Sequence, residues 1–221
     1  MPKFIVGARL HDYGKGSPDE LFGRVAADGF TAVQLAYKKC VPSVRSYADV
    51  TDALVAETIA AEKAHSIQVA VLGTYVELAI NDESRLKNAA DFKSQLAVCK
   101  ALGAGCIGTE TTAMSKQPAG TTREEAQELL CRSLADILPA AEALGVTVAV
   151  EPVTYHSMNS AAATRHILDT MRSPNLKVIF DMSNLVDAGN VGAQNRIWND
   201  VGELLGDQIV AVHFKGQAFA P

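Results

Sequence analysis

Two carboxylates and one imidazole occupy similar positions in three separate parts of this chain. Glu151, Asp181 and His213 each come directly after a short, mostly apolar run. A carboxylate at the end of a buried segment is costly unless it is paired, hydrogen-bonded or bound to a cation. Carboxylate oxygens and imidazole nitrogens are also ligands with which proteins hold divalent metals. We therefore predict that these three residues bind one divalent metal ion and leave coordination positions open for a substrate.

Each of the three residues, taken alone, has a simpler explanation. Asp181 could cap the loop that follows it, Glu151 could pair with a neighbouring lysine or arginine, and His213 could be a hydrogen-bonded core histidine. Their shared position, at the ends of successive apolar runs, favours one metal site over three unrelated explanations.

The hydrophobic pattern predicts the elements that carry these residues. Long amphipathic segments separate seven short apolar runs, which occupy residues 4–10, 32–36, 67–72, 106–108, 146–150, 176–180 and 209–212. Successive runs start too far apart for hairpins, and the spacing fits a strand, a crossover helix and two loops. Most positions within a run are apolar, as expected for parallel strands that are buried on both faces.

Local signals place helices between the predicted strands. Ser17 and Thr122 each precede a glutamate three residues later, which is the capping-box pattern of a helix start. Asn81 precedes two acidic residues, which suit the positive end of a helix dipole. A left-handed residue commonly closes a helix, and we expect glycine in that role before four strands, at Gly29, Gly103, Gly145 and Gly206.

Alternating strands and helices with right-handed crossovers form either an open doubly wound sheet or a closed barrel. No G-x-G-x-x-G motif follows the first predicted strand, and the chain has no G-x-x-x-x-G-K-[ST] loop. The absence of these nucleotide-binding loops favours the closed barrel over the open sheet. We therefore predict an α/β protein with a (β/α)₈ TIM barrel. Both folds bind ligands at the C-terminal ends of the strands, where the three predicted ligands lie.

Three motifs, at residues 150–153, 179–185 and 212–215, resemble one known family. Together they resemble the sugar phosphate isomerase/epimerase superfamily, whose members have a xylose isomerase-like TIM barrel of the AP endonuclease 2 type. The resemblance extends over the whole chain and includes residues 72–75 and 108–111. It implies an isomerase or epimerase that acts on a small sugar, a sugar phosphate or a polyol.

The resemblance also implies a cofactor and a mechanism. A divalent ion (Mn, Mg, Co or Zn) would be held by Glu151, Asp181, His213 and a second glutamate. This ion would stabilise the enediolate that forms when a carboxylate removes a proton beside a carbonyl. Glu151 would be both a metal ligand and a catalytic acid–base group. The expected partner is a small-molecule carbohydrate, and a homo-oligomer is a further expectation.

Two features depart from the family pattern. The second glutamate of the family comes from an eighth strand, and no eighth strand–helix unit is evident before the sequence ends at Pro221. We therefore expect residues 1–221 to form a single xylose isomerase-like TIM-barrel domain that is incomplete at its C-terminus. Asn184 and Ser157 stand where ketose 3-epimerases carry histidine and glutamate, so the identity of the sugar does not follow from that subgroup.

Five other polar residues near predicted strand ends are candidates for substrate binding: His156, Asn184, Lys215, Glu110 and His11. Lys215 could bind an anionic group such as phosphate or could pair with a carboxylate. His156 could hydrogen-bond a substrate hydroxyl or face solvent. Glu110 and His11 could contact substrate or make local bonds within their loops.

Composition limits the remaining function classes. The formal net charge is −5 and the basic residues are dispersed, which argues against a nucleic-acid partner. No apolar run approaches the roughly 18–20 residues that span a bilayer, and no signal-peptide pattern follows Met1, so we expect no membrane association. The four cysteines have irregular spacing, which indicates reduced thiols in a cytoplasmic protein.

Two alternative functions stay open. An endonuclease IV-like nuclease acting on abasic DNA would share the fold, although five histidines and an acidic balance count against it. A non-catalytic sugar-binding barrel would be compatible with the missing eighth strand.

Overall fold

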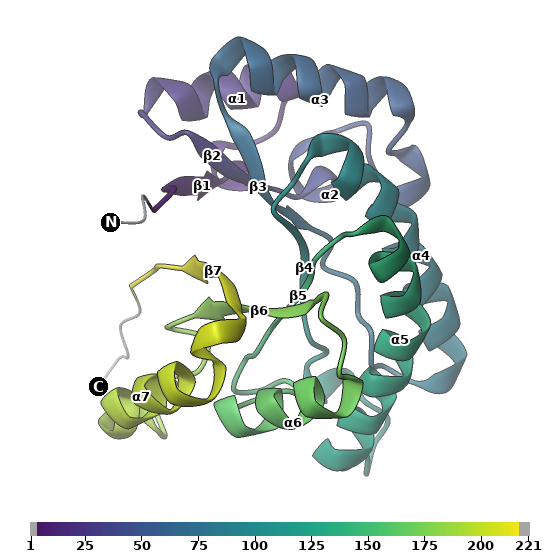
Figure 1. The fold of residues 1–221 in the computed structure, drawn as a ribbon, viewed down its shortest axis with the longest axis vertical. Coiled ribbons are helices and arrows are strands. Elements are labelled where there is room, and N and C mark those ends of the chain that lie inside the picture. The colour runs from purple at the N-terminus through teal and green to yellow at the C-terminus, as the bar shows by residue number, and fades with distance from the viewer. Residues whose placement is uncertain (1–3, 217–221) are drawn as a thin grey trace.

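One curved parallel sheet organises the computed structural model, which describes residues 4–216. Each strand pairs with the next one in the sequence, and Figure 1 shows the strands as an arc with most helices outside it. The strands are β1 (Gly7–Arg9), β2 (Ala32–Leu35), β3 (Gln68–Gly73), β4 (Cys106–Glu110), β5 (Val148–Glu151), β6 (Leu176–Asp181) and β7 (Ile209–His213). The helices are α1 (Pro18–Ala27), α2 (Tyr37–Cys40), α3 (Asp52–His65), α4 (Asp82–Leu102), α5 (Arg123–Leu144), α6 (Ala161–Met171) and α7 (Gln194–Leu205).

The predicted helix starts are confirmed. Ser17 and Thr122 form capping boxes at the starts of α1 and α5, and the side chain of Asn81 accepts a hydrogen bond from the Ser84 amide at the start of α4. These caps satisfy backbone donors that have no partner inside the helix. They fix the residue at which each of these crossover helices begins.

The predicted helix ends are only partly confirmed. Gly103 and Gly145 close α4 and α5 with φ values of +63° and +67°. The prediction for Gly206 is wrong: its φ is −52°, because α7 continues directly into a 3₁₀ turn instead of closing in a left-handed residue. Ser66 and Arg172 take left-handed conformations at the ends of α3 and α6, although neither residue is a glycine.

The two faces of the sheet have different roles. Alternate strand residues such as Val148, Val150 and Val178 pack with the helices in the main core. The residues between them form a separate small cluster, namely Val71, Cys106, Ala149 and Ile179. Because side chains alternate between the faces of a strand, this second cluster lies on the concave face. The last residues of β4, β5, β6 and β7 have the same parity, so the sequence places them on the concave face too.

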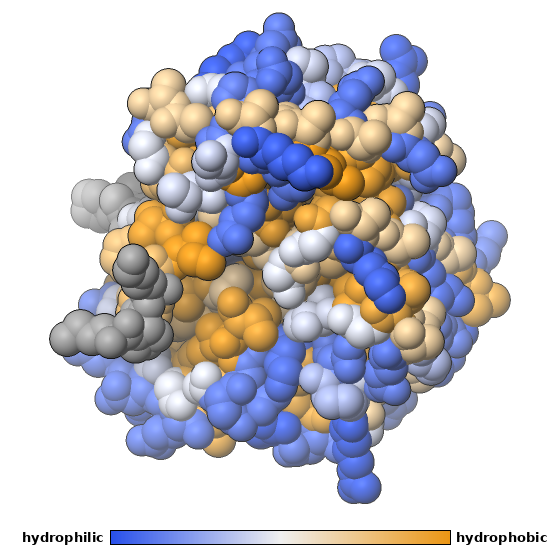
Figure 2. Space-filling model, turned by 45° about the horizontal axis from the view of Figure 1, so that its top comes forward, coloured by the Kyte–Doolittle hydropathy of each residue, from blue (hydrophilic) through white to orange (hydrophobic). Residues whose placement is uncertain are grey.

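The sheet has two edges, at β1 and β7, because these strands do not pair with each other in the described part of the chain. Large apolar side chains are exposed along both edges, namely Phe4, Ile5, Val6, Val210, Val212 and Phe214. Figures 1 and 2 show the two edges facing one opening, and apolar surface on the side that carries both chain ends. The first strand is shorter than predicted, Gly7–Arg9 instead of 4–10, since pairing with β2 begins only at Gly7.

Among the helices of residues 4–216, none combines the length and apolar character required to cross a membrane.

Candidate metal centre

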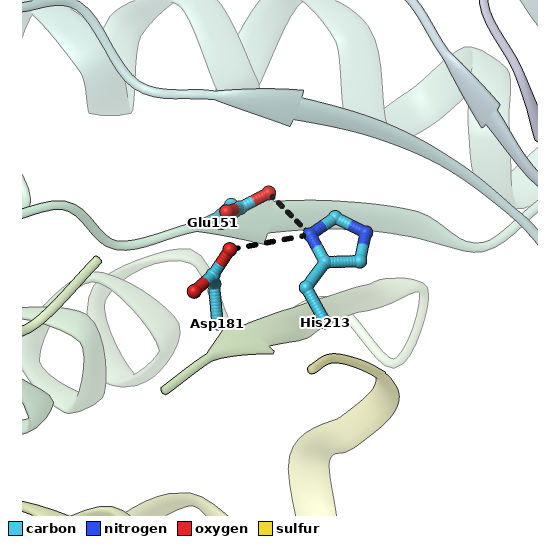
Figure 3. A group of neighbouring side chains, drawn as sticks. All are labelled: Glu151, Asp181 and His213. Carbon is cyan, nitrogen blue, oxygen red and sulfur yellow. Dashed lines mark ion pairs between the residues drawn. The ribbon is translucent and has the colours of Figure 1, made fainter. Parts of the chain in front are cut away.

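Three neighbouring strands end in the three predicted ligands. Glu151, Asp181 and His213 are the last residues of β5, β6 and β7, so each strand runs one residue further than its apolar run suggests. Asp181 and His213 are also register partners across β6 and β7. Figure 3 shows the three side chains pointing toward one another.

The distances within this group are short. His213 Nδ1 lies 3.2 Å from Glu151 Oε2 and 3.9 Å from Asp181 Oδ2. One potential ligand atom from each residue lies within 4.8 Å of the other two. The side chains of Glu151 and Asp181 are only 6% and 2% exposed, so two carboxylates share a buried location. Their mutual repulsion requires compensating positive charge.

Each carboxylate has one oxygen held by the protein. Asp181 Oδ1 accepts hydrogen bonds from the backbone amides of Ser183 and Asn184, at 2.9 and 3.2 Å. Glu151 Oε1 accepts a hydrogen bond from Asn184 Nδ2 at 2.5 Å. The other oxygens, Oδ2 and Oε2, are the ones that face His213. Such outer hydrogen bonds orient metal ligands, and Asn184 serves both carboxylates at once.

Lys215 supplies positive charge next to the buried carboxylates. Its Nζ lies 2.9 Å from Asp181 Oδ2 and donates to Asn184 Oδ1 at 2.8 Å. Lys215 and Asn184 therefore contact the predicted ligands directly. An ammonium ion and a divalent cation would compete for the same oxygen of Asp181, so filling the centre with metal would require Lys215 to turn away.

The donor set fits a divalent metal ion. Two inward carboxylate oxygens and an imidazole nitrogen are hard and borderline ligands of the kind that bind Mg, Mn, Co or Zn. The other ring nitrogen, His213 Nε2, is buried and has no hydrogen-bond partner among residues 4–216. The assignment of these residues as metal ligands stays a prediction.

Glu110 lies beside this group but outside it. It is the last residue of β4 and the register partner of Glu151. Burial raises the pKa of the Glu110 carboxyl, and the neighbouring charge of Glu151 raises it further. Its predicted role in substrate binding is compatible with this position at the mouth.

His156 and His11 lie on loops that follow strands. His156 is 5% exposed, and burial lowers its pKa to about 4. Its carbonyl accepts a hydrogen bond from Arg123, and its ring packs edge-on against Tyr155 with centroids 4.7 Å apart. The interpretation of His156 as a solvent-facing residue is therefore wrong. His11 lies in a 3₁₀ turn after β1, and its ring lies near the ring of Tyr75. Tyr75 was not among the site residues predicted from the sequence.

Two surface hollows lie away from these residues. One, of about 320 Å³, is lined by residues that include Arg165, Arg172 and Gln208, and one of about 290 Å³ lies between α6 and α7. Neither contains a predicted metal ligand. The candidate metal ligands converge at the strand ends and not in either hollow.

A curved parallel sheet with outer helices is the architecture of the TIM-barrel class, in which ligands bind at the C-terminal ends of the strands. The chain belongs to the xylose isomerase-like TIM barrel family, whose model matches residues 22–220. A search of curated protein sequences found no significant match.

Solved structures share this fold at low sequence identity. The 3-keto-D-glucoside 4-epimerase of E. coli is 16% identical, with a TM-score of 0.74, and the match covers 96% of this chain and 78% of that one. A xylose isomerase-like TIM-barrel protein from Mycobacterium smegmatis in complex with magnesium is 13% identical (TM-score 0.71, 91% and 72% covered). A D-psicose 3-epimerase crystallised in the presence of D-fructose is 18% identical (TM-score 0.70, 90% and 71% covered).

Proposed function

We propose that the chain is a divalent-metal-dependent isomerase or epimerase of a small sugar, sugar phosphate or polyol. The observation that carries the proposal is the convergence of Glu151, Asp181 and His213, whose potential ligand atoms all lie within 4.8 Å of one another. Family membership and the epimerases among the structural neighbours support the class of reaction.

The proposed roles follow from the contacts. Glu151, Asp181 and His213 would hold the ion, and Asn184 orients both carboxylates. When bound, a divalent ion supplies Lewis-acid polarisation of a substrate carbonyl. Glu151 would accept the proton from the carbon beside that carbonyl and deliver it to the neighbouring carbon in an isomerisation. An epimerisation would need a second acid group that protonates the same carbon from its opposite face. Lys215, displaced from Asp181, is free to donate to a substrate oxygen, and Glu110 is placed to bond a hydroxyl.

Metal binding tests the first part of this proposal. Purified protein should bind Mn²⁺ with one strong site, measured by calorimetry and by elemental analysis after dialysis. Glu151→Gln and Asp181→Asn should each lose that site. Asp169→Asn is the matched control, because Asp169 lies on α6 and pairs with Arg165. Equal Mn²⁺ affinity in the wild type and in both site variants would remove the proposed centre.

Proton exchange tests the second part. The Mn²⁺-loaded protein is incubated in D₂O with a panel of ketoses, and deuterium at the carbons beside the carbonyl is followed by NMR. Exchange that disappears in Glu151→Gln and persists in Asp169→Asn supports the reaction class. Tight metal binding without exchange into any ketose of the panel would favour a non-catalytic sugar-binding barrel.

A further inference from the structure

The cavity of about 320 Å³ lies at the opposite end of β6 from the candidate metal centre. The C-terminal part of α6 (Figure 1) forms one wall and contributes Arg165, Asp169 and Arg172. The opposite wall includes Leu176, which begins β6, and Gln208, which precedes β7. The two ends of β6 are roughly 17 Å apart at the usual rise of a strand. The cavity is therefore separate from the metal centre.

Two arginines in this cavity have hydrogen-bond donors to spare. Arg165 Nη2 donates to Asp169 Oδ1 at 2.7 Å, but Arg165 Nε is buried and has no hydrogen-bond partner among residues 4–216. Within the same residues, the only side-chain hydrogen bond of Arg172 runs from Nε to the Asp169 carbonyl at 3.3 Å. A guanidinium carries several N–H donors in a planar fork and no acceptor. Most donors of Arg172 are therefore free of partners within the described chain.

The lining of the cavity has an excess of positive charge. Its two guanidiniums face a single carboxylate, Asp169. A second carboxylate, Glu142, accepts a hydrogen bond from the hydroxyl of Ser173, which also lines the cavity. Glu142 is exposed, so water and salt screen its charge. An anion in the cavity would compensate the excess charge of the arginines.

The rest of the lining supplies an amide and an apolar surface. Gln208 accepts a hydrogen bond from Lys177 Nζ at 2.7 Å and donates to Asp207 at 2.8 Å, so a cation and an anion beside the cavity offset each other. Leu168 and Leu176 also line the cavity. The site can therefore hold a ligand with a charged end and a carbon part.

The backbone at Arg172 is unusual for an arginine. This residue ends α6 with a φ of +52°, whereas glycines end α4 and α5 in the same left-handed region. Backbone strain at a residue other than glycine is a reason to look for a function of its side chain. A simpler explanation is that a cation suits the negative end of the α6 dipole, and this explanation requires no ligand.

We propose that this cavity binds the phosphate group of a small organic molecule. A phosphate presents three oxygens and more than one negative charge, so both guanidiniums can donate to it at once. The carbon part of the ligand packs on Leu168 and Leu176. A volume of about 320 Å³ lies in the lower range of small-molecule sites, which suits a ligand of metabolite size. This inference does not rest on the proposed function.

Calorimetric titration with inorganic phosphate and with phenyl phosphate tests the site. The protein is first freed of metal on a chelating resin, so that neither probe can bind through a metal ion. Arg172→Asn removes one guanidinium and keeps a residue that tolerates the left-handed conformation. Arg165→Met removes the other guanidinium and keeps an unbranched apolar stem. Each variant should weaken the binding of both probes at least roughly tenfold, as expected for the loss of a charge-assisted hydrogen bond.

Arg132→Met is the matched control, because Arg132 is a surface arginine of α5 that pairs with Asp82 and does not line the cavity. It should bind both probes as the wild type does. Unfolding midpoints without a probe detect any folding defect, and a defect in one cavity variant leaves the other as the test. Saturating phosphate should raise the midpoint more in the wild type and Arg132→Met than in the two cavity variants.

Several results would overturn the inference. One is equal phosphate affinity in the wild type, Arg172→Asn and Arg165→Met, and another is an equal loss in Arg132→Met. Absence of binding by the wild type would leave the helix-dipole explanation for Arg172. Tighter binding of acetate than of inorganic phosphate would overturn the assignment to phosphate. Tighter binding of phenyl phosphate than of inorganic phosphate supports an organic ligand, and the reverse order would overturn that part of the inference.

Discussion

Lowering the pH from 6.5 to about 4 should destabilise the native protein through His156. The imidazole of this residue is buried, and burial lowers its pKa to about 4, against an ordinary value of 6.5. Glu77 opposes this shift, whereas Lys116 and Arg123 add to it. Between these pH values His156 binds a proton in the unfolded chain but not in the folded chain, so the free energy of unfolding decreases as the pH falls. The loss ends near pH 4, where the native imidazole also becomes protonated.

The size of this effect follows from the pKa difference. Within this window, each pH unit changes the free energy of unfolding by about 1.4 kcal/mol for one titrating group. His156 should therefore lower the free energy of unfolding by about 3 kcal/mol between pH 6.5 and 4. Carboxylates also titrate in this window, and a His156→Gln variant separates the histidine from them. The wild type should lose about 3 kcal/mol more than the variant over the same pH interval.

Urea denaturation at several pH values measures this difference. Tyr155→Leu is the control, because it removes the aromatic neighbour of His156 but keeps the imidazole, and so it should retain the wild-type pH dependence. A free-energy difference between the wild type and His156→Gln that stays constant from pH 7 to 4.5 would refute the reasoning. It would mean that the imidazole takes up its proton equally in both states.

Three other substitutions test the site and its framework. Asn184→Ala removes the side-chain bond to Glu151 and keeps the backbone bond to Asp181, so it should lower Mn²⁺ affinity about tenfold by freeing Glu151; unchanged affinity in a chelator competition would contradict the orienting role. Thr122→Ala should cost about 1 kcal/mol in urea unfolding through the lost cap of α5, and a neutral result would show that the capping box contributes nothing there. Gly108→Ala should cost about 1–3 kcal/mol, since a Cβ would lie 2.5 Å from Ile179 Cδ1. Adding Ile179→Val, which deletes that atom, should restore part of the lost stability. No recovery would mean that the clash with Ile179 is not the cause of the destabilisation.

The strand–helix order and the positions of the predicted ligands could be read from the sequence because they depend on local patterns. Apolar runs mark buried strands, and the polar residue that follows a run marks the strand end. The length of β1 could not be read in this way. Phe4, Ile5 and Val6 have the composition of a strand, yet pairing decides whether such a segment becomes one, and β2 pairs only from Gly7 onward.

Contacts between distant loops are also invisible to local patterns. Asn184 and Lys215 were recognisable as polar residues near strand ends, but their bonds to the two carboxylates depend on how two loops meet. Tyr75 belongs to residues 72–75, which share the family resemblance, but the sequence does not reveal its conformation. Its left-handed backbone angle and its contact with Lys39 are set by the three-dimensional structure.

The strictly sequential pairing of the strands also affects how the protein is made. Each strand finds its partner in the strand synthesised just before it, so the sheet can grow in the order of translation. The proposed metal ligands lie on the last three described strands, and His213 leaves the ribosome after the other two. A nascent chain therefore acquires all three of these residues only when the described sheet is complete. Metal uptake would thus report that synthesis and folding have reached β7.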